Sequence, residues 1–121
     1  MMPKFSRRSL DRLATCDQRL QDVMNEAIKD YDFMVLEGHR SPERQKELFE
    51  AGFSKTLKSK HVAVPSLAVD IAPYPLDWKD IERFKVMAQV VKNAAKRLYI
   101  KIEWGGDWKS FKDCPHFQLP N

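Results

Sequence analysis

The stretch Leu67-Ala68-Val69-Asp70-Ile71-Ala72 decides the fold, because it is an apolar run with one charged side chain inside it. Prolines at positions 73 and 75 end the run, so it is typical of a short strand in a small domain. A lone carboxylate is costly to bury in such surroundings unless something compensates its charge. Backbone amides at a strand edge could do so, and so could a bound cation.

Two histidines elsewhere in the chain favour the cation. His61 ends the segment Ser59-Lys60-His61, and His116 ends Asp113-Cys114-Pro115-His116. Two imidazoles and one carboxylate suffice to hold a catalytic Zn²⁺ that keeps its fourth position for water. Asp113 lies three residues before a ligand, where a general base is needed. We therefore predict a divided zinc site made by His61, Asp70 and His116, with Asp113 beside it.

The apolar pattern places this site in an α+β fold. The 3.6-residue period predicts helices over 17–29, 42–51 and 77–98, with a shorter helical turn around Leu10 and Leu13. Ser41-Pro42 is typical of a helix start, and Asp77 is the expected cap of the longest helix. Strands are expected over 33–36, 67–72, 100–104 and 116–119, with a turn at Gly105-Gly106. We expect a small antiparallel sheet packed with helices and the zinc site at the sheet.

Composition limits the alternatives. The chain has 121 residues, which is enough for one hydrophobic core, so we expect a single domain over 1–121 that carries the zinc site. Its apolar runs are far shorter than the roughly 20 residues of a membrane span, and its basic start is not followed by the apolar stretch of a signal peptide. We therefore expect synthesis in the cytoplasm and no stable membrane insertion.

Charge and cysteines add little to this prediction. A net charge of +4 favours polyanionic partners, but the basic residues are spread along the chain without a nucleic-acid-binding signature. We therefore expect no nucleic acid partner. Cys16 and Cys114 match no CxxC motif, so free thiols are expected. A contact from the Cys114 sulfur to the metal stays an alternative.

The combined motifs resemble those of zinc D,D-peptidases and L-alanyl-D-glutamate endopeptidases of bacterial cell-wall peptides. The resemblance rests on Ser59-Lys60-His61, on Ala68-Val69-Asp70, on Asp113-Cys114-Pro115-His116 and on the upstream Gly38-His39-Arg40-Ser41. It runs from about Phe5 to Leu119, and the short form is most similar to a bacteriophage endolysin. Such a protein would be made in the host cytoplasm and act as a monomer on peptidoglycan at the cell wall.

The resemblance also implies a role for each matching residue. His61, Asp70 and His116 would bind zinc, Asp113 would be the general base, and Arg40 would stabilise the polarised substrate. Supporting or substrate-binding positions are implied for Ser59 and Gln45. We add Trp104 as a candidate substrate contact, with core packing as its alternative. His39 is expected on the opposite strand face and outside the site.

One departure from the family pattern affects His61. Seven positions usually separate the first histidine from the aspartate, with a glycine between them, whereas here the step is nine and contains no glycine. The extra residues are expected to bulge in the loop before the strand. The leading hypothesis is cleavage between L-alanine and D-glutamate. The alternatives are a D-alanyl-D-alanine carboxypeptidase and a non-catalytic cell-wall binding module of the same fold.

Overall fold

Strand β2 (Ala68–Pro73) lies inside a four-stranded antiparallel sheet, as predicted for the apolar run around Asp70. The computed structural model describes residues 3–110 and 112–121 and orders the strands β1-β2-β4-β3. The other strands are β1 (Phe33–Glu37), β3 (Glu103–Trp104) and β4 (His116–Gln118). The helices among the described residues are α1 (Arg7–Leu13), α2 (Gln18–Ala27), α3 (Pro42–Glu50), α4 (Ile81–Arg97) and the 3-10 helices η1 (Lys60–Val62) and η2 (Gly105–Asp107). The predicted α+β class is confirmed.

The sheet has one apolar and one polar face. Successive side chains of a strand point to opposite faces, so Val69 and Ile71 share the core face of β2 while Asp70 points the other way. On β4, Phe117 is fully buried in the same core. His116 and Gln118 therefore lie on the face that carries Asp70.

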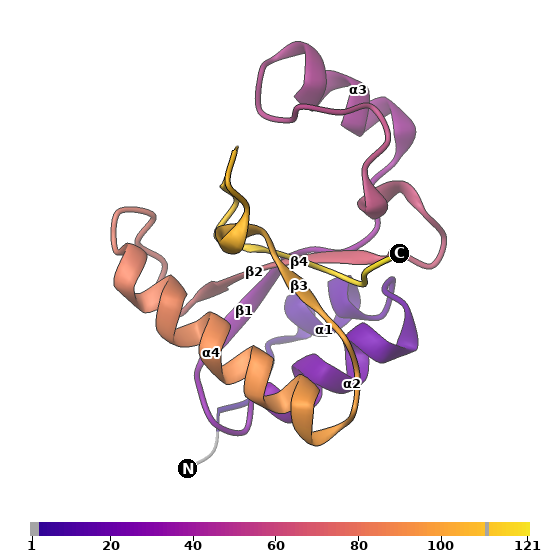
Figure 1. Cartoon of the computed structure of the whole chain (residues 1–121). Helices are drawn as coiled ribbons and strands as arrows, with labels where there is room; N and C mark the ends of the chain where they lie inside the picture. Colours follow the sequence, from indigo (N-terminus) through magenta and orange to yellow (C-terminus); the bar gives the residue numbers. More distant parts are fainter. Residues whose placement is uncertain (1–2, 111) are drawn as a thin grey trace.

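Helices α1, α2 and α4 cover the apolar face (Figure 1). Helix α1 packs on β1, α4 packs on β2, and α2 packs on α4. Each presents an apolar stripe, which explains why the helical period was readable from the sequence. The most deeply buried large side chains of this core are Phe84, Phe117, Leu20, Met24, Ile71 and Met87.

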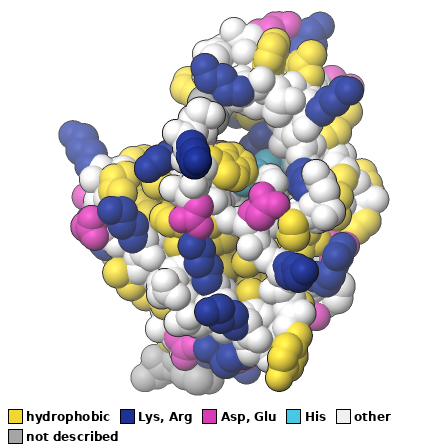
Figure 2. All heavy atoms as spheres, viewed as in Figure 1, with side chains coloured by type: hydrophobic (Ala, Val, Ile, Leu, Met, Phe, Trp, Pro, Cys, Tyr) yellow, Lys and Arg dark blue, Asp and Glu magenta, His cyan; other side chains and the backbone are white. Residues whose placement is uncertain are grey.

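Residues 41–59, here called the arm, lie on the other side of the sheet and contain α3 (Figure 1). Pro42 occupies the first turn of α3, and the hydroxyl of Ser41 accepts a hydrogen bond from the backbone N–H of Arg44 at 3.0 Å. Gln45 is the buried residue of this helix. The space-filling view shows a hollow between the arm and the body of the molecule, with a histidine side chain at its base (Figure 2).

Two details of the predicted elements were wrong. The longest helix begins at Ile81 and is capped by Asp80, whose carboxylate accepts from the backbone N–H of Arg83. Asp77 instead accepts from the N–H of Lys79 in the preceding turn, because two more residues, Trp78 and Lys79, precede the cap. The third strand covers only Glu103–Trp104, since residues 100–102 form no ladder pairs with β4.

Candidate active site

Asp70, His61 and His116 converge on the polar face of the sheet. Asp70 Oδ1 lies 3.1 Å from His61 Nε2 and 3.2 Å from His116 Nδ1. Asp70 and His116 are directly opposed in the β2–β4 ladder, and Glu37 opposes Asp70 on the other side in β1. His61 comes from η1, so three separate segments of the chain meet at this point. One ligand atom from each of the three residues can lie within 4.8 Å of the others, so this group could hold a metal ion.

The ring of His61 is oriented by a backbone carbonyl. Its Nδ1 lies 2.7 Å from the carbonyl oxygen of Gly38, which can only accept. Nδ1 therefore carries the hydrogen in the neutral ring, and the lone pair of Nε2 faces Asp70. Gly38 approaches α1 so closely that a Cβ would lie 2.4 Å from the carbonyl oxygen of Arg12, so a side chain there would displace the carbonyl that holds His61.

A side-chain amide orients the ring of His116. The carboxylate of Glu103 can only accept, so the amide nitrogen of Gln118 faces it at 3.3 Å. The amide oxygen of Gln118 then faces His116 Nε2 at 2.8 Å and accepts its hydrogen. This leaves the lone pair of His116 Nδ1 directed at Asp70.

Three acceptor atoms therefore meet with no hydrogen between them when both rings are neutral. Such a group is stabilised by a cation, either a metal ion or protons on the histidines. Burial raises the pKa of Asp70, but hydrogen bonds from the protonated rings of His116 and His61 together outweigh it and hold that pKa well below its usual range. Burial lowers the pKa of His116, but the hydrogen bond to Asp70 raises it above its ordinary value. The donor set of two imidazoles and a carboxylate fits Zn²⁺.

The nine-residue step from His61 to Asp70 does not pull the two side chains apart. The backbone N–H of Leu67 donates to the carbonyl of Lys60 at 3.0 Å, which closes residues 61–66 into a loop. Ser66 fixes the base of that loop, since its backbone pairs with Thr15 and Asp17, while Val64 is 83% exposed at the surface. The extra residues bulge outward, as the sequence predicted.

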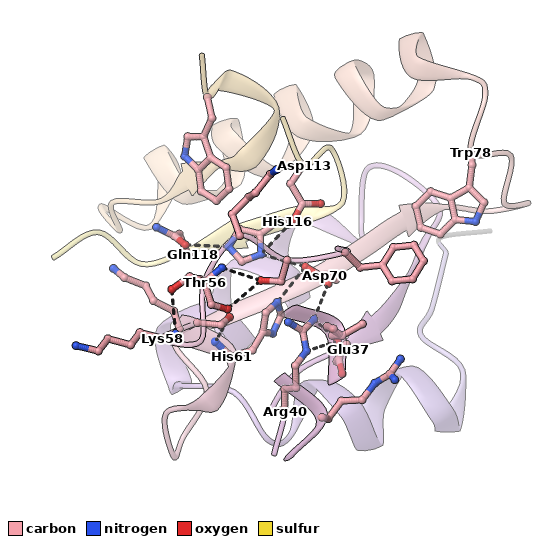
Figure 3. A pocket seen from close by; sticks show the side chains of 18 residues that line it. Glu37, Arg40, Thr56, Lys58, His61, Asp70, Trp78, Asp113, His116 and Gln118 are labelled. Atoms are coloured by element: carbon pink, nitrogen blue, oxygen red, sulfur yellow. Dashed lines mark hydrogen bonds and ion pairs between the residues drawn. The ribbon is translucent and has the colours of Figure 1, made fainter. Parts of the chain in front are cut away.

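Asp113 and Arg40 lie beside the metal-binding group and line the same cavity (Figure 3). Asp113 Oδ2 is 4.0 Å from His116 Nδ1, and burial, with the charge of Asp70 adding to it, raises the pKa of Asp113. The guanidinium of Arg40 is fixed by Glu37, by the amide oxygen of Gln45 at 2.8 Å and by Asp70 at 3.5 Å. A carboxylate and a guanidinium thus face the space next to the candidate metal position.

The remaining predicted residues have different surroundings. The hydroxyl of Ser59 caps η1 by accepting from the N–H of His61 at 3.2 Å, and Ser59 lines the cavity. Gln45 is fully buried behind Arg40 and donates to Ser54 and to the carbonyl of Thr56. Trp104 lies in the core, where it stacks on Phe117 and donates to the carbonyl of Cys114, and it does not line the cavity. Its position therefore matches the core-packing alternative.

The cavity has a volume of about 810 Å³ and is lined by the arm on one side and by the sheet on the other. Two indoles line it, Trp78 and Trp108, and of these only Trp78 carried no signal in the sequence. Glu37 and Gln118, which line the cavity too, were not predicted. Gln118 was findable, because residues two apart on a strand share a face and Gln118 follows His116 by two. Glu37 carried no such signal, since its contact with Arg40 depends on the chain turning after β1.

Other predicted features can be placed as well. His39 is exposed, with Nδ1 at 3.1 Å from the carbonyl of Ala63, and lines a different depression. Cys16 and Cys114 are both free thiols, and Cys114 is not among the residues that line the cavity. None of the helices in the described part of the chain combines the length and apolar character needed to span a membrane.

Comparison with known proteins agrees with this geometry. Residues 1–118 match the family described as phage L-alanyl-D-glutamate peptidase. The chain is 34% identical over 118 residues to the L-alanyl-D-glutamate peptidase of Escherichia phage T5, covering 91% of this chain and 85% of the relative. It is 33% identical over 113 residues to the peptidoglycan L-alanyl-D-glutamate endopeptidase CwlK of Bacillus subtilis, covering 78% of this chain and 65% of the relative.

A solved structure is similar over nearly the whole fold. The crystal structure of the Serratia marcescens L-Ala D-Glu endopeptidase ChiX superposes with a TM-score of 0.85 at 36% identity, covering 97% of this chain and 90% of that one. Fold and site together define a peptidase-like α+β domain with a His/Asp/His group at its sheet that could hold a metal ion. The chain belongs to the phage L-alanyl-D-glutamate peptidase family.

Proposed function

We propose that this chain is a zinc-dependent, endolysin-type peptidase that hydrolyses the bond between L-alanine and D-glutamate in peptidoglycan stem peptides. The observation that carries the proposal is the convergence of three acceptor atoms from His61, Asp70 and His116, with Asp113 next to them. The names of the relatives supply the bond and the substrate. They favour this bond over the D-alanyl-D-alanine bond that the sequence left as an alternative.

In this proposal His61, Asp70 and His116 hold the zinc ion. Bound there, zinc supplies Lewis acidity and lowers the pKa of a water molecule from about 16 towards 7. Asp113 takes the proton from the attacking water and transfers it to the leaving amine of D-glutamate. Burial raises the pKa of Asp113, which suits a group that must both accept and return a proton. Arg40 offers a guanidinium to the negative charge that develops on the carbonyl oxygen.

The surrounding residues keep these groups in position. Gly38 and Gln118 hold the two histidine rings, while Glu37 and Gln45 hold Arg40. All the residues named come from one copy of the chain, so a monomeric single domain over residues 1–121 suffices for the reaction. We propose that it acts at the bacterial cell wall after synthesis in a host cell.

The test is the release of new amino groups from purified peptidoglycan, with the products assigned by mass. Zinc-loaded protein should release them, a chelator should stop the release, and Asp113→Asn should abolish it while still binding one zinc ion. Asp107→Asn removes an exposed carboxylate of the same segment and should retain activity. Full activity of Asp113→Asn would contradict the role of Asp113 as general base. No cleavage of any wall by zinc-loaded protein would favour the non-catalytic binding module instead.

A further inference from the structure

The two ends of the cavity over the metal-binding group differ in chemistry. Trp78 and Lys58 lie at opposite sides of the close view, with His61, Asp70 and His116 between them (Figure 3). All five residues line the same cavity. A ligand that spans the cavity across the candidate metal position would therefore meet an aromatic side chain at one end and a cation at the other.

The basic end belongs to the arm and to η1. Every charged side chain that residues 44–60 contribute to the cavity is a cation, whereas its acidic lining residues come from β1, β2 and the segment before β4. Arg44 already pairs with Glu47 at 3.3 Å, and the ammonium of Lys60 donates to the carbonyl of Leu119. Lys58 is exposed, and within the part of the chain that the structure describes it forms no ion pair. Lys58 is thus an exposed cation at this end of the cavity that can receive an incoming carboxylate.

The aromatic end is a rigid platform. The ring of Trp78 stacks on Phe84, with centroids 5.7 Å apart and planes inclined by 16°. Phe84 is almost completely buried, whereas Trp78 is 54% exposed. One face of the indole is therefore fixed against the core, and the other remains for a ligand with apolar C–H groups, such as the face of a sugar ring.

The substrate of the proposed reaction, on which this inference rests, has matching ends. L-Alanine is acylated by the lactyl group of muramic acid, so a sugar lies one residue before the bond to be cleaved. D-Glutamate, joined onward through its side chain, carries its α-carboxylate directly after that bond. We propose that the cavity binds the stem peptide in one direction, with the D-glutamate carboxylate at Lys58 and the muramyl group on Trp78.

The experiment uses two pairs of synthetic substrates. One pair differs in the D-glutamate α-group, which is a carboxylate or a carboxamide. The other pair carries either a muramyl or an acetyl group on L-alanine. Preference is measured as the ratio of kcat/KM within each pair, and as the ratio of Kd when the same compounds are titrated into zinc-loaded Asp113→Asn.

Each variant should change one preference only. Lys58→Gln should reduce the preference for the carboxylate by about fivefold, as expected for loss of a solvent-accessible charge pair, and leave the muramyl preference unchanged. Trp78→Leu keeps an apolar contact with Phe84 but removes the aromatic face, so it should reduce only the muramyl preference. Lys46→Gln and Tyr74→Ala change similar residues that do not line this cavity and should alter neither ratio.

The outcomes separate this inference from the proposed function. If Lys58→Gln changed only the muramyl preference and Trp78→Leu only the carboxylate preference, the peptide would bind in the reverse direction. If neither variant changed either ratio, Lys58 and Trp78 would not contact the substrate. Either result overturns the inference. If the wild type cleaves none of the compounds but Asp113→Asn still shows the Lys58-dependent and Trp78-dependent ratios in binding, the proposed reaction fails and the binding direction stands.

Discussion

The amide oxygen of Gln118 accepts the Nε2 hydrogen of His116 at 2.8 Å, so a neutral side chain fixes which imidazole nitrogen faces Asp70. Glu103 completes the chain by accepting from the Gln118 amide nitrogen, and these two residues are directly opposed in the β3–β4 ladder. The short strand β3 therefore contributes to the site although none of its residues touches the candidate metal position.

Replacing Gln118 should weaken metal binding without unfolding the protein. Gln118→Leu frees the His116 ring to rotate or change tautomer, and loss of such a partner typically costs 10- to 100-fold in metal affinity. Zinc affinity is measured by competition with a chromophoric chelator. Gln89→Leu removes an exposed glutamine that bonds only to Asn93 and serves as the control. Equal zinc affinity of Gln118→Leu and wild type would contradict the role assigned to the amide.

Gln45 connects the arm to Arg40, so its loss should loosen the arm. Its side chain is fully buried and bonds to Arg40, Ser54 and the carbonyl of Thr56. Gln45→Leu leaves these groups without their partner, which should lower the free energy of unfolding by about 1–3 kcal/mol. Cleavage of the arm by a low concentration of protease should also become faster. Gln18→Leu, at an exposed helix position, should change neither quantity.

The buried thiol of Cys16 should make stability depend on alkaline pH. Burial raises the pKa of Cys16 from 9.0 to about 11, and its Sγ lies 3.8 Å from the carbonyl of Ala68. The unfolded chain therefore loses this proton at a lower pH than the folded chain does. The contribution of the protonated thiol to the free energy of unfolding is therefore complete below pH 9 and is lost as the pH rises towards 11.

Urea unfolding at pH 8, 9, 10 and 11 measures this loss, compared between wild type and Cys16→Ala. The wild type should lose more stability over this range than the variant, by at most about 2–3 kcal/mol. Parallel curves for the two proteins would show that the thiol does not titrate differently in the folded state. Cys114→Ala provides the second cysteine variant for comparison.

The start of α4 gives a direct test of the capping residue. Asp80→Ala removes the side chain that accepts from the N–H of Arg83 and should lower the free energy of unfolding by about 1 kcal/mol. Asp77→Ala should have a smaller effect, because Asp77 bonds within the preceding turn. The two midpoints of urea unfolding provide the comparison, and a larger loss for Asp77→Ala would place the cap where the sequence pattern had suggested it.

The sequence predicted those elements whose signals are local. Ser41-Pro42 marked the start of α3, and the apolar run around Asp70 marked β2, because capping and burial leave their signature within a few residues. It misjudged Asp77, since two nearby aspartates can both cap a helix and only the path of the chain after β2 selects Asp80. It also extended the third strand to residue 100, because apolar residues there pack against the core without pairing.

In the candidate site, too, residues with a local sequence signal were predicted and residues placed by the path of the chain were not. His61, Asp70, His116 and Asp113 were chosen by residue type, and the fold brings them together. Glu37 and the Gly38 carbonyl could not be predicted, because their contacts arise from the register of β1 against β2 and from the close approach of α1. Trp104 was predicted as a substrate contact, but its ring lies in the core. Trp78, from a loop far away in sequence, lines the cavity instead.

The backbone hydrogen bond from Leu67 to the carbonyl of Lys60 closes the intervening loop at its base. The number of residues in this loop therefore does not set the distance between His61 and Asp70. His61 is held by Gly38 and Ser59 on one side of this closure, and Asp70 is held by the sheet on the other. The outermost part of the loop, near Val64, is therefore a permissive insertion point. A tag or a small wall-targeting module grafted there would extend from the surface while the ligands keep their places.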